Sequence, residues 1–192
     1  MKFLSKTADS NILKQGLTYL SGNAENNAIL RNLLLKEQKN FCAYTEKYID
    51  HLDSVEVEHF NSSIKYNDDY YNYYAVLRRA NLYKKDEQYK GETFFDNLFF
   101  QTDFESRIQF LSGDLVYEET NPDDTEARNF IDFIGLNYYD VYEDRKNHIN
   151  RLKDIFSNPE DLVGYFRKHK EELKFITAIE VEFELDLSEF YR

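Results

Sequence analysis

Hydrophobic and polar residues recur with a helical period near the start of the chain. In residues 24–39 (AENNAILRNLLLKEQK), Ile29, Leu30, Leu33 and Leu34 occur at helical spacing, and charged residues follow them. Side chains three and four positions apart share one face of a helix. This stretch therefore predicts an amphipathic helix.

The next pattern has the two-residue period of strands. The segments TEKYID (45–50) and SVEVEHF (54–60) flank a turn, and valine alternates with glutamate in the second segment. Alternation of this kind is typical of a strand with one buried face. We predict that the two segments form a hairpin that ends at His59.

A polar loop and two further segments complete this region. The loop NSSIKYNDD (61–69) precedes YYNYYAVL (70–77), which is apolar enough for a buried strand or for the start of a helix. The segment RRANLYKKDEQYK (78–90) is compatible with a helix and holds the densest local cluster of Lys and Arg. The predicted order is strand, strand, loop, strand and helix.

The C-terminal half of the chain is predicted to be mainly helical. A hairpin is expected at residues 106–119, where Ser-Gly-Asp separates two apolar alternations. A helix is expected at residues 122–136, because the segment opens with Pro and acidic residues and stops near Gly135. Residues 138–156 and 159–180 continue as helices on either side of an Asn-Pro break. The predicted fold class is α+β.

Composition limits the size and the surroundings of the protein. The chain has 192 residues, of which 42% are hydrophobic, so it is long enough for one ordinary core and short for two domains. A single cysteine, Cys42, excludes an internal disulfide and fits a reducing compartment. No segment has the roughly 18 apolar residues of a membrane helix, or the apolar stretch of a signal peptide. We expect a single-domain cytoplasmic protein that does not enter a membrane.

The charge of the chain restricts how it meets nucleic acid. The formal net charge of −12 argues against broad, nonspecific binding, because phosphate contacts need clustered Lys and Arg. Any nucleic-acid surface is therefore expected to be local, or to be supplied by a partner.

One stretch carries residues suited to phosphodiester hydrolysis. Between Phe41 and Lys85 the chain reads CAYTE, then VEHF, then Asn72 within YYNYYAVL, then RRANLYKK. In this order and spacing, the stretch resembles a family of small bacterial HNH endonucleases that includes the nuclease subunit of the Septu antiviral system. The core of that family reads roughly CAYCE, EHF, a loop, and NLLLAC-RRCN-xxK. Similar downstream segments extend the resemblance from about residue 25 to about residue 156.

The resemblance implies a fold and a chemistry. It predicts a ββα-metal core at residues 41–90, with residues 91–192 forming a hairpin and a helical extension. Glu58 and Asn81 would supply hard oxygen ligands to a single Mg²⁺ or Mn²⁺ ion. His59 would be the general base, because an imidazole titrates near neutral pH. Asn72 would brace the loop and orient the histidine.

The basic residues after the second predicted strand are candidate phosphate contacts. They are Arg78, Arg79, Lys84 and Lys85. The alternative for all four is a solvated helix face that pairs with the protein's own carboxylates. His59 likewise has a structural reading, as a strand-end histidine bonded to nearby backbone. Asn72 and Asn81 can be ordinary turn and helix residues.

The chain departs from the family at the structural zinc site. The four cysteines of the family correspond here to Cys42, Thr45, Leu77 and Ala80, so three zinc ligands are absent. A structural zinc contributes folding energy, so packing must replace it. We expect no structural zinc, and Cys42 is expected to be a buried apolar residue. We assign no chemistry to the other histidines.

Three functions remain open at this point. The first is a metal-dependent HNH nuclease acting on nucleic acid, with DNA the expected substrate, as an antiviral effector working with an ABC-type ATPase partner. The second is an interaction subunit that keeps the HNH scaffold without catalysis. The third is an unrelated small α+β binding protein, for which Glu58, His59 and Asn81 would lie far apart.

Overall fold

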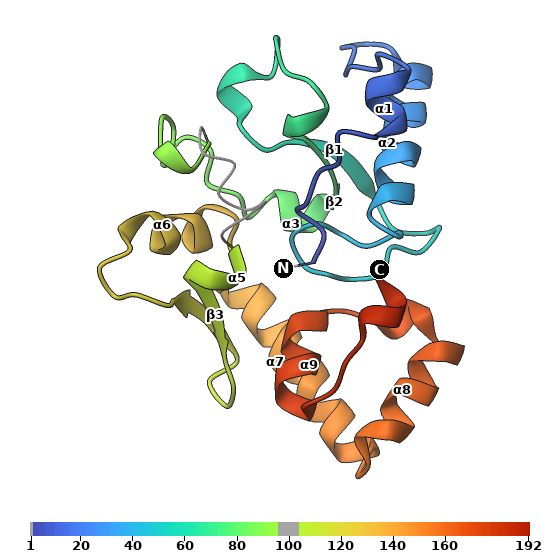
Figure 1. Ribbon diagram of the computed structural model, residues 1–192, viewed down its shortest axis with the longest axis vertical. Helices are drawn as coiled ribbons and strands as arrows, with labels where there is room; N and C mark the ends of the chain where they lie inside the picture. The colour runs from blue at the N-terminus through green and yellow to red at the C-terminus, as the bar shows by residue number, and fades with distance from the viewer. Residues whose placement is uncertain (1, 96–103) are drawn as a thin grey trace.

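The structure, a computed structural model, describes residues 2–95 and 104–192 and has an α+β fold (Figure 1). Residues 96–103 of the predicted C-terminal extension lie outside the described residues. The strands form two antiparallel pairs, β1 with β2 and β3 with β4. In chain order the described elements are α1 (Asn11–Lys14), α2 (Ala24–Glu37), β1 (Val55–His59), η1 (Ser62–Ile64), η2 (Tyr70–Asn72), β2 (Tyr73–Leu77), α3 (Arg78–Asn81), η3 (Thr93–Phe95), α5 (Phe104–Arg107), β3 (Ile108–Leu111), β4 (Val116–Glu119), α6 (Thr125–Phe133), α7 (Tyr139–Ile155), α8 (Pro159–Lys168), η4 (Lys170–Glu172), α9 (Ile176–Phe183) and η5 (Ser188–Phe190).

The first sheet is followed at once by a short helix. In the antiparallel pairing of β1 with β2, Val55 lies opposite Leu77 and His59 lies opposite Tyr73. Strand β2 is buried along most of its length, and α3 begins directly after it at Arg78. The long loop between the strands therefore starts and ends beside His59.

Helix α2 packs against this sheet. Its side chains Leu30 and Leu34 are buried together with Tyr73 and Ala75 of β2. The helix begins where the side chain of Asn23 accepts a hydrogen bond from the backbone N–H three residues later, at 3.0 Å. Leu33 packs against the same core, whereas Ile29 is 44% exposed, so three of the four predicted apolar positions face the first sheet.

The buried side chain of Gln38 ties the end of α2 to β2. Its Nε2 donates to the carbonyl oxygens of Phe41 (2.8 Å) and Ala75 (2.9 Å). Its Oε1 accepts from the backbone N–H of Ala75, at 2.8 Å. One amide side chain therefore satisfies both backbone groups of a buried strand residue, which would otherwise carry a desolvation cost.

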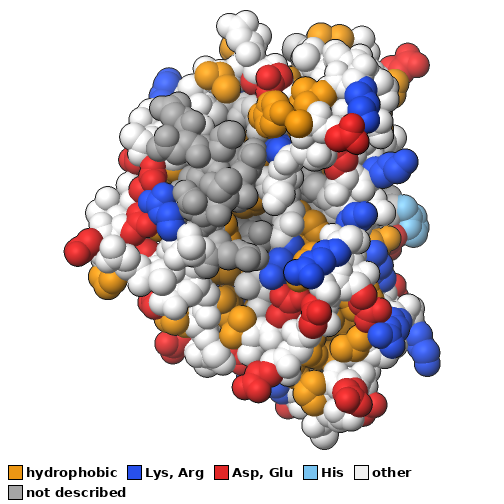
Figure 2. Space-filling view, in the orientation of Figure 1, with side chains coloured by type: hydrophobic (Ala, Val, Ile, Leu, Met, Phe, Trp, Pro, Cys, Tyr) orange, Lys and Arg blue, Asp and Glu red, His pale blue; other side chains and the backbone are white. Residues whose placement is uncertain are grey.

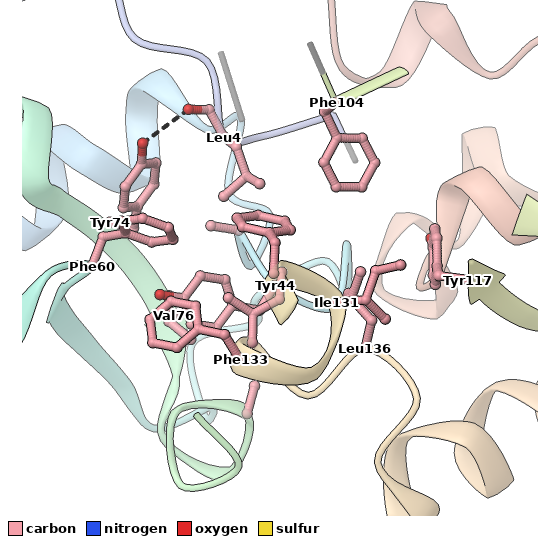
Figure 3. Packing of buried hydrophobic residues seen from close by; sticks show 14 of the residues in the cluster. Leu4, Tyr44, Phe60, Tyr74, Val76, Phe104, Tyr117, Ile131, Phe133 and Leu136 are labelled. Carbon is pink, nitrogen blue, oxygen red and sulfur yellow. Dashed lines mark hydrogen bonds between the residues drawn. The ribbon is translucent and has the colours of Figure 1, made fainter. Parts of the chain in front are cut away.

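Aromatic rings from distant segments form the centre of the largest core (Figure 3). The ring centroid of Phe60 lies 5.4 Å from that of Phe133 and 6.5 Å from that of Phe94. Ring pairs at such distances contribute about 0.5–1.5 kcal/mol beyond the burial of their area. In the same core, the hydroxyl of Tyr74 donates to the carbonyl oxygen of Leu4, at 3.0 Å. The first sheet and α6 therefore share one core.

The second sheet and α6 follow the turn and cap signals of the sequence. Strands β3 and β4 pair antiparallel around a turn in which Gly113 has φ 84°. Helix α6 begins where the side chain of Asp124 accepts from the N–H of Ala127, at 3.0 Å. It ends at Phe133, and two residues later Gly135 has φ 68°, where an added Cβ would lie 3.1 Å from the Cβ of Tyr83. Only glycine fits this helix end without strain.

Helices α7, α8 and α9 form the lower part of the molecule in Figure 1. They bury Leu152, Phe166 and Ile179 in a second core. Helix α8 begins with Pro159 in its first turn, and the side chain of Asn158 accepts a hydrogen bond from the backbone N–H of Glu160, at 3.1 Å.

A buried carboxylate connects this helical part to the rest of the chain. The side chain of Glu46, which is 1% exposed, accepts hydrogen bonds from the N–H of Thr177 at 2.7 Å and the N–H of Lys2 at 2.9 Å. The N–H of Tyr48 also donates to the carbonyl oxygen of Leu173, at 2.8 Å. The segment before β1 is thus bonded directly to the residues around the start of α9.

The structure confirms several predicted elements and corrects three. The helix near the N-terminus, the hairpin at 106–119, the helix ending near Gly135 and the mainly helical C-terminal half are present. The predicted hairpin is wrong in its partner, because β1 pairs with β2 and residues 45–50 form no strand. The helix predicted at 78–90 ends at Asn81, and the helix predicted at 159–180 is interrupted after Lys168.

Among the described residues, no helix combines the length and the apolar character needed to cross a membrane.

Candidate active site

His59 lies at the end of β1 with one ring nitrogen held by a buried carboxylate. Its Nδ1 is 2.6 Å from Oδ2 of Asp68. The side chain of Asp68 is 2% exposed, and that of His59 is 17% exposed. None of the described residues hydrogen-bonds Nε2 of His59.

The carboxylate that holds His59 is itself held by two residues at the start of β2. Asn72 donates from Nδ2 to Oδ2 of Asp68 at 2.7 Å, and the hydroxyl of Tyr73 lies 2.8 Å from Oδ1. Asn72 also closes the loop, because its Oδ1 accepts from the N–H of Asn61 (2.7 Å) and its Nδ2 donates to the carbonyl oxygen of Asn61 (3.1 Å). Asn72 therefore reaches His59 only through Asp68.

Two tyrosine rings enclose the imidazole. The rings of Tyr19 and Tyr73 meet that of His59 edge-on, with centroids 4.8 Å and 5.4 Å away. The backbone N–H of Tyr19 donates to the hydroxyl of Tyr73, at 3.2 Å. Packing on two sides and a bond at Nδ1 fix both the orientation and the tautomer of the ring.

Asp68 was missed in the sequence. It stands in the polar loop 61–69 beside a second aspartate, and this loop pattern gives no reason to prefer one of the two. The one sequence feature that could have pointed to Asp68 was the length of the loop. Its two ends meet at the His59–Tyr73 pair, so a loop residue can lie beside His59.

On the other side of β1, Glu58 faces a buried lysine. Glu58 is 5% exposed, and its Oε1 contacts Nζ of Lys84. Lys84 Nζ also lies 2.9 Å from Oδ1 of Asp86, 2.8 Å from the carbonyl oxygen of His59 and 3.3 Å from that of Phe60. Burial raises the pKa of the Glu58 carboxyl, and the ammonium of Lys84 opposes that rise. Four oxygens thus converge on one ammonium.

The core also holds a buried hydroxyl without a partner. Tyr44 is 3% exposed, and its hydroxyl has no hydrogen-bond partner among the described residues. Burial raises the pKa of Tyr44 well above its ordinary value, and the charges of Glu58 and Asp86 add to the rise. An unpaired buried hydroxyl is costly in free energy.

Asn81 does not meet Glu58 in this structure. Its Nδ2 donates to Oε2 of Glu56, at 3.0 Å. Glu56 and Glu58 lie two positions apart on β1 and therefore on one face of the strand. Asn81 is thus paired with Glu56, and Glu58 with Lys84, so the binding of one ion by Glu58 and Asn81 together stays a prediction.

The donors fit a divalent ion in kind, but a lysine lies among them. Carboxylate and carbonyl oxygens are the ligands that Mg²⁺ and Mn²⁺ prefer. Within the described residues, no group of three or more His, Cys, Asp and Glu side chains is arranged to hold a metal ion. The ammonium of Lys84 occupies the position to which the oxygens of Glu58 and Asp86 point. A metal ion therefore fits here only after Lys84 has moved.

The two arginines proposed as phosphate contacts are exposed. Nε of Arg78 lies 3.6 Å from Glu56, and Nη2 of Arg79 lies 3.5 Å from Asp140. Exposed ion pairs of this kind contribute little, about 0–1 kcal/mol, so phosphate can compete for both side chains. Lys and Arg are interspersed with Asp and Glu on the face shown in Figure 2.

The two lysines proposed with them differ from each other. Lys85 is partly exposed and lies 2.6 Å from Asp132. The side chain of Lys84 is only 2% exposed and is held by Glu58. Burial makes Lys84 unsuitable as a phosphate contact in this structure, which corrects the prediction for this residue.

The four positions that match the family's zinc ligands lie close together. The N–H of Leu77 donates to Sγ of Cys42, at 3.4 Å, and Cys42 is fully buried. Thr45, Leu77 and Ala80 line one cavity of about 600 Å³. A tight turn with Glu46 at φ 53° brings residues 42–47 into this arrangement. Charged residues, among them Asp53, Arg79 and Asp144, line the same cavity.

Comparison of the chain with protein-family models, with curated proteins and with solved structures gave no match. The fold class is α+β, and His59 lies in a unit made of β1, a loop, β2 and α3.

Proposed function

We propose that this protein is a metal-dependent HNH-type endonuclease that hydrolyses phosphodiester bonds in nucleic acid. The observation that carries the proposal is the position of His59 at the end of β1. Its Nδ1 is bonded to the buried carboxylate of Asp68, and its Nε2 is left unbonded by the described residues. This is the arrangement that a general base needs, because one nitrogen fixes the ring and the other accepts a proton.

The roles of the residues follow from their contacts. His59 would take a proton from the attacking water at Nε2. Asp68 would keep the proton of the neutral imidazole on Nδ1 and stabilise the imidazolium that forms. Asn72 would hold Asp68 and the loop in place. A bound Mg²⁺ or Mn²⁺ ion would hold the scissile phosphate and stabilise charge on the leaving oxygen, with Glu58 and Asn81 as its proposed ligands.

The biological setting is part of the same proposal. The preferred substrate is DNA, and the protein would act in the cytoplasm as an antiviral effector together with an ABC-type ATPase. The net charge of −12 supports control by a partner, because an acidic protein binds host nucleic acid poorly by itself.

A second candidate is an interaction subunit that keeps the scaffold without catalysis. It is favoured by Lys84, whose ammonium lies where a catalytic metal would meet Glu58. Under this alternative, His59 and Asp68 are a structural pair that stabilises the loop.

Cleavage assays with matched histidine variants distinguish the two candidates. Wild type, His59→Ala and His51→Ala are incubated with DNA and RNA in Mg²⁺ or Mn²⁺, alone and with proteins that copurify from the native host. His51 is the control because its side chain is 80% exposed. We expect metal-dependent cleavage by wild type and His51→Ala, reduced by about 10²–10⁴-fold in His59→Ala. Equal cleavage by all three proteins would reject His59 as the base, and no cleavage in any combination with an intact fold supports the interaction subunit.

A further inference from the structure

Lys84 is a buried cation whose ammonium is surrounded by oxygen on several sides. Its ammonium contacts Glu58, lies 2.9 Å from Asp86, and donates to two backbone carbonyls, those of His59 and Phe60. Its side chain is 2% exposed. We propose that Lys84 is an internal substitute for the metal ion, and that a divalent cation binds Glu58 and Asp86 only by displacing the Lys84 ammonium.

The charges of the cluster support an exchange. Two carboxylates face one ammonium, which gives the cluster a formal charge of −1; Glu58 is buried, and the side chain of Asp86 is 34% exposed. A divalent cation at the same place would neutralise both carboxylates. Because uncompensated charge is expensive in a buried site, the oxygens of Glu58 and Asp86 favour the divalent ion once it has lost part of its water.

The oxygen donors also suit a hard cation better than an ammonium. An ammonium has three protons to donate, whereas four oxygens converge here. Mg²⁺ and Mn²⁺ bind six oxygens, some of them from water.

The flexible stem of Lys84 permits the exchange. Lys84 follows the end of α3 by three residues and lies in a turn, so its movement does not unwind a helix. Its side chain has four rotatable bonds, and an ammonium is strongly hydrated once released. This inference deepens the proposed nuclease function by assigning the control of its metal site to Lys84.

The test measures metal binding and lysine exposure without reference to cleavage. Mn²⁺ is titrated into wild type, Lys84→Met and Lys85→Met, and free Mn²⁺ is measured by electron paramagnetic resonance. Lys85 is the matched control, because it is the next residue and pairs with Asp132 instead. We expect Lys84→Met to bind one Mn²⁺ at least about tenfold more tightly than wild type, because the competing ion pair is gone. Lys85→Met should match wild type.

A second measurement uses the wild-type protein, since Lys84→Met leaves a buried carboxylate unpaired and can fail to fold. The protein is acetylated with an amine-reactive reagent, with and without Mn²⁺, and the modification of Lys84 is read by mass spectrometry. We expect Lys84 to be protected without metal and modified with it. Lys84 that stays protected at saturating Mn²⁺, or a folded Lys84→Met that binds no more tightly than wild type, overturns the exchange.

These outcomes are separate from those of the cleavage test. His59-dependent cleavage with Lys84 always protected keeps the nuclease and removes the exchange. Metal-dependent exposure of Lys84 without cleavage keeps the exchange and removes the nuclease.

Discussion

Nδ1 of His59 lies 2.6 Å from Oδ2 of Asp68, and this carboxylate is almost completely buried. A buried carboxylate that accepts from Nδ1 selects the tautomer with the proton on that nitrogen. The opposite nitrogen is then an acceptor. This relationship makes Asp68 the positioning residue of the proposed base.

Replacing this carboxylate should impair catalysis without unfolding the loop. In Asp68→Asn, we expect cleavage to fall by about a hundredfold or more, because the amide no longer enforces the tautomer. The ¹⁵N chemical shifts of the His59 ring give a readout independent of activity, and the Nδ1–H tautomer should lose its dominance. Asp69→Asn is the control, since Asp69 is exposed and only caps the turn at Tyr71. An unchanged tautomer in Asp68→Asn contradicts the positioning role.

Restoring the missing cysteines should restore a zinc site. Thr45, Leu77 and Ala80 line one cavity, and the N–H of Leu77 already donates to Sγ of Cys42. We expect the triple variant Thr45→Cys, Leu77→Cys, Ala80→Cys to bind zinc and to melt at a higher temperature with zinc than with chelator. The absorption of bound Co²⁺ checks for four thiolates. Adding Cys42→Ser to the triple variant should weaken zinc binding. A triple variant that does not bind zinc would count against the HNH resemblance.

The buried guanidinium of Arg145 should be a main determinant of stability. Its Nε donates to the carbonyl oxygen of Leu115 at 2.8 Å, and its Nη1 donates to that of Leu136 at 2.9 Å. We expect Arg145→Met to lower the free energy of unfolding by about 2–5 kcal/mol, because both buried carbonyls lose their donor. Urea denaturation measures the change. Arg151→Met, at an exposed pair with Glu172, should cost less than about 1 kcal/mol.

His148 should make the protein less stable in acid. The pKa of His148 is lowered from 6.5 to about 4, mainly by burial. The positive charges of Lys174 and Arg151 contribute to this decrease, and their effect is larger than the opposing effect of the negative charges of Asp144 and Glu172. Between these two values the unfolded chain binds a proton that the folded chain does not, so the free energy of unfolding decreases as pH falls. The loss attributable to His148 is about 3 kcal/mol.

Urea denaturation of wild type and His148→Leu from pH 7 to pH 4 isolates this contribution. We expect a smaller acid-induced loss in the variant than in wild type. His51→Leu should behave as wild type, because His51 is exposed. Parallel loss of stability in wild type and His148→Leu would contradict the assignment.

Local patterns predicted the elements whose partners are near in the sequence. The leucines of α2, the glycine turn between β3 and β4, and the Pro start of α8 each act within a few residues. The predicted partner of β1 was wrong because strand pairing depends on which buried segment completes the core. Tyr73–Leu77 is more apolar than residues 45–50 and pairs with β1 instead. Periodicity contains no information on that competition.

In the candidate site, too, some residues were predicted from local sequence motifs and others were missed because their roles depend on distant contacts. The order of motifs located His59 and Asn72, which the structure places in one hydrogen-bonded group. It did not locate Asp68, because a loop aspartate gains its role only when the loop closes on Asn72. Nor did it indicate that Lys84 folds inward, since a lysine after a short helix is usually solvated.

Glu46 connects the helical part of the protein to the segment that lies beside the C-terminal end of β2. Its carboxylate bonds to Thr177 at the start of α9, and its backbone belongs to the turn that holds Cys42 beside β2. A partner protein that shifted α9 would therefore also shift residues 42–47, which lie beside β2. Cutting the chain before α9 would remove both bonds from Thr177 and leave the buried carboxylate with the bond from the N–H of Lys2, so the turn at residues 42–47 should lose stability with the helix.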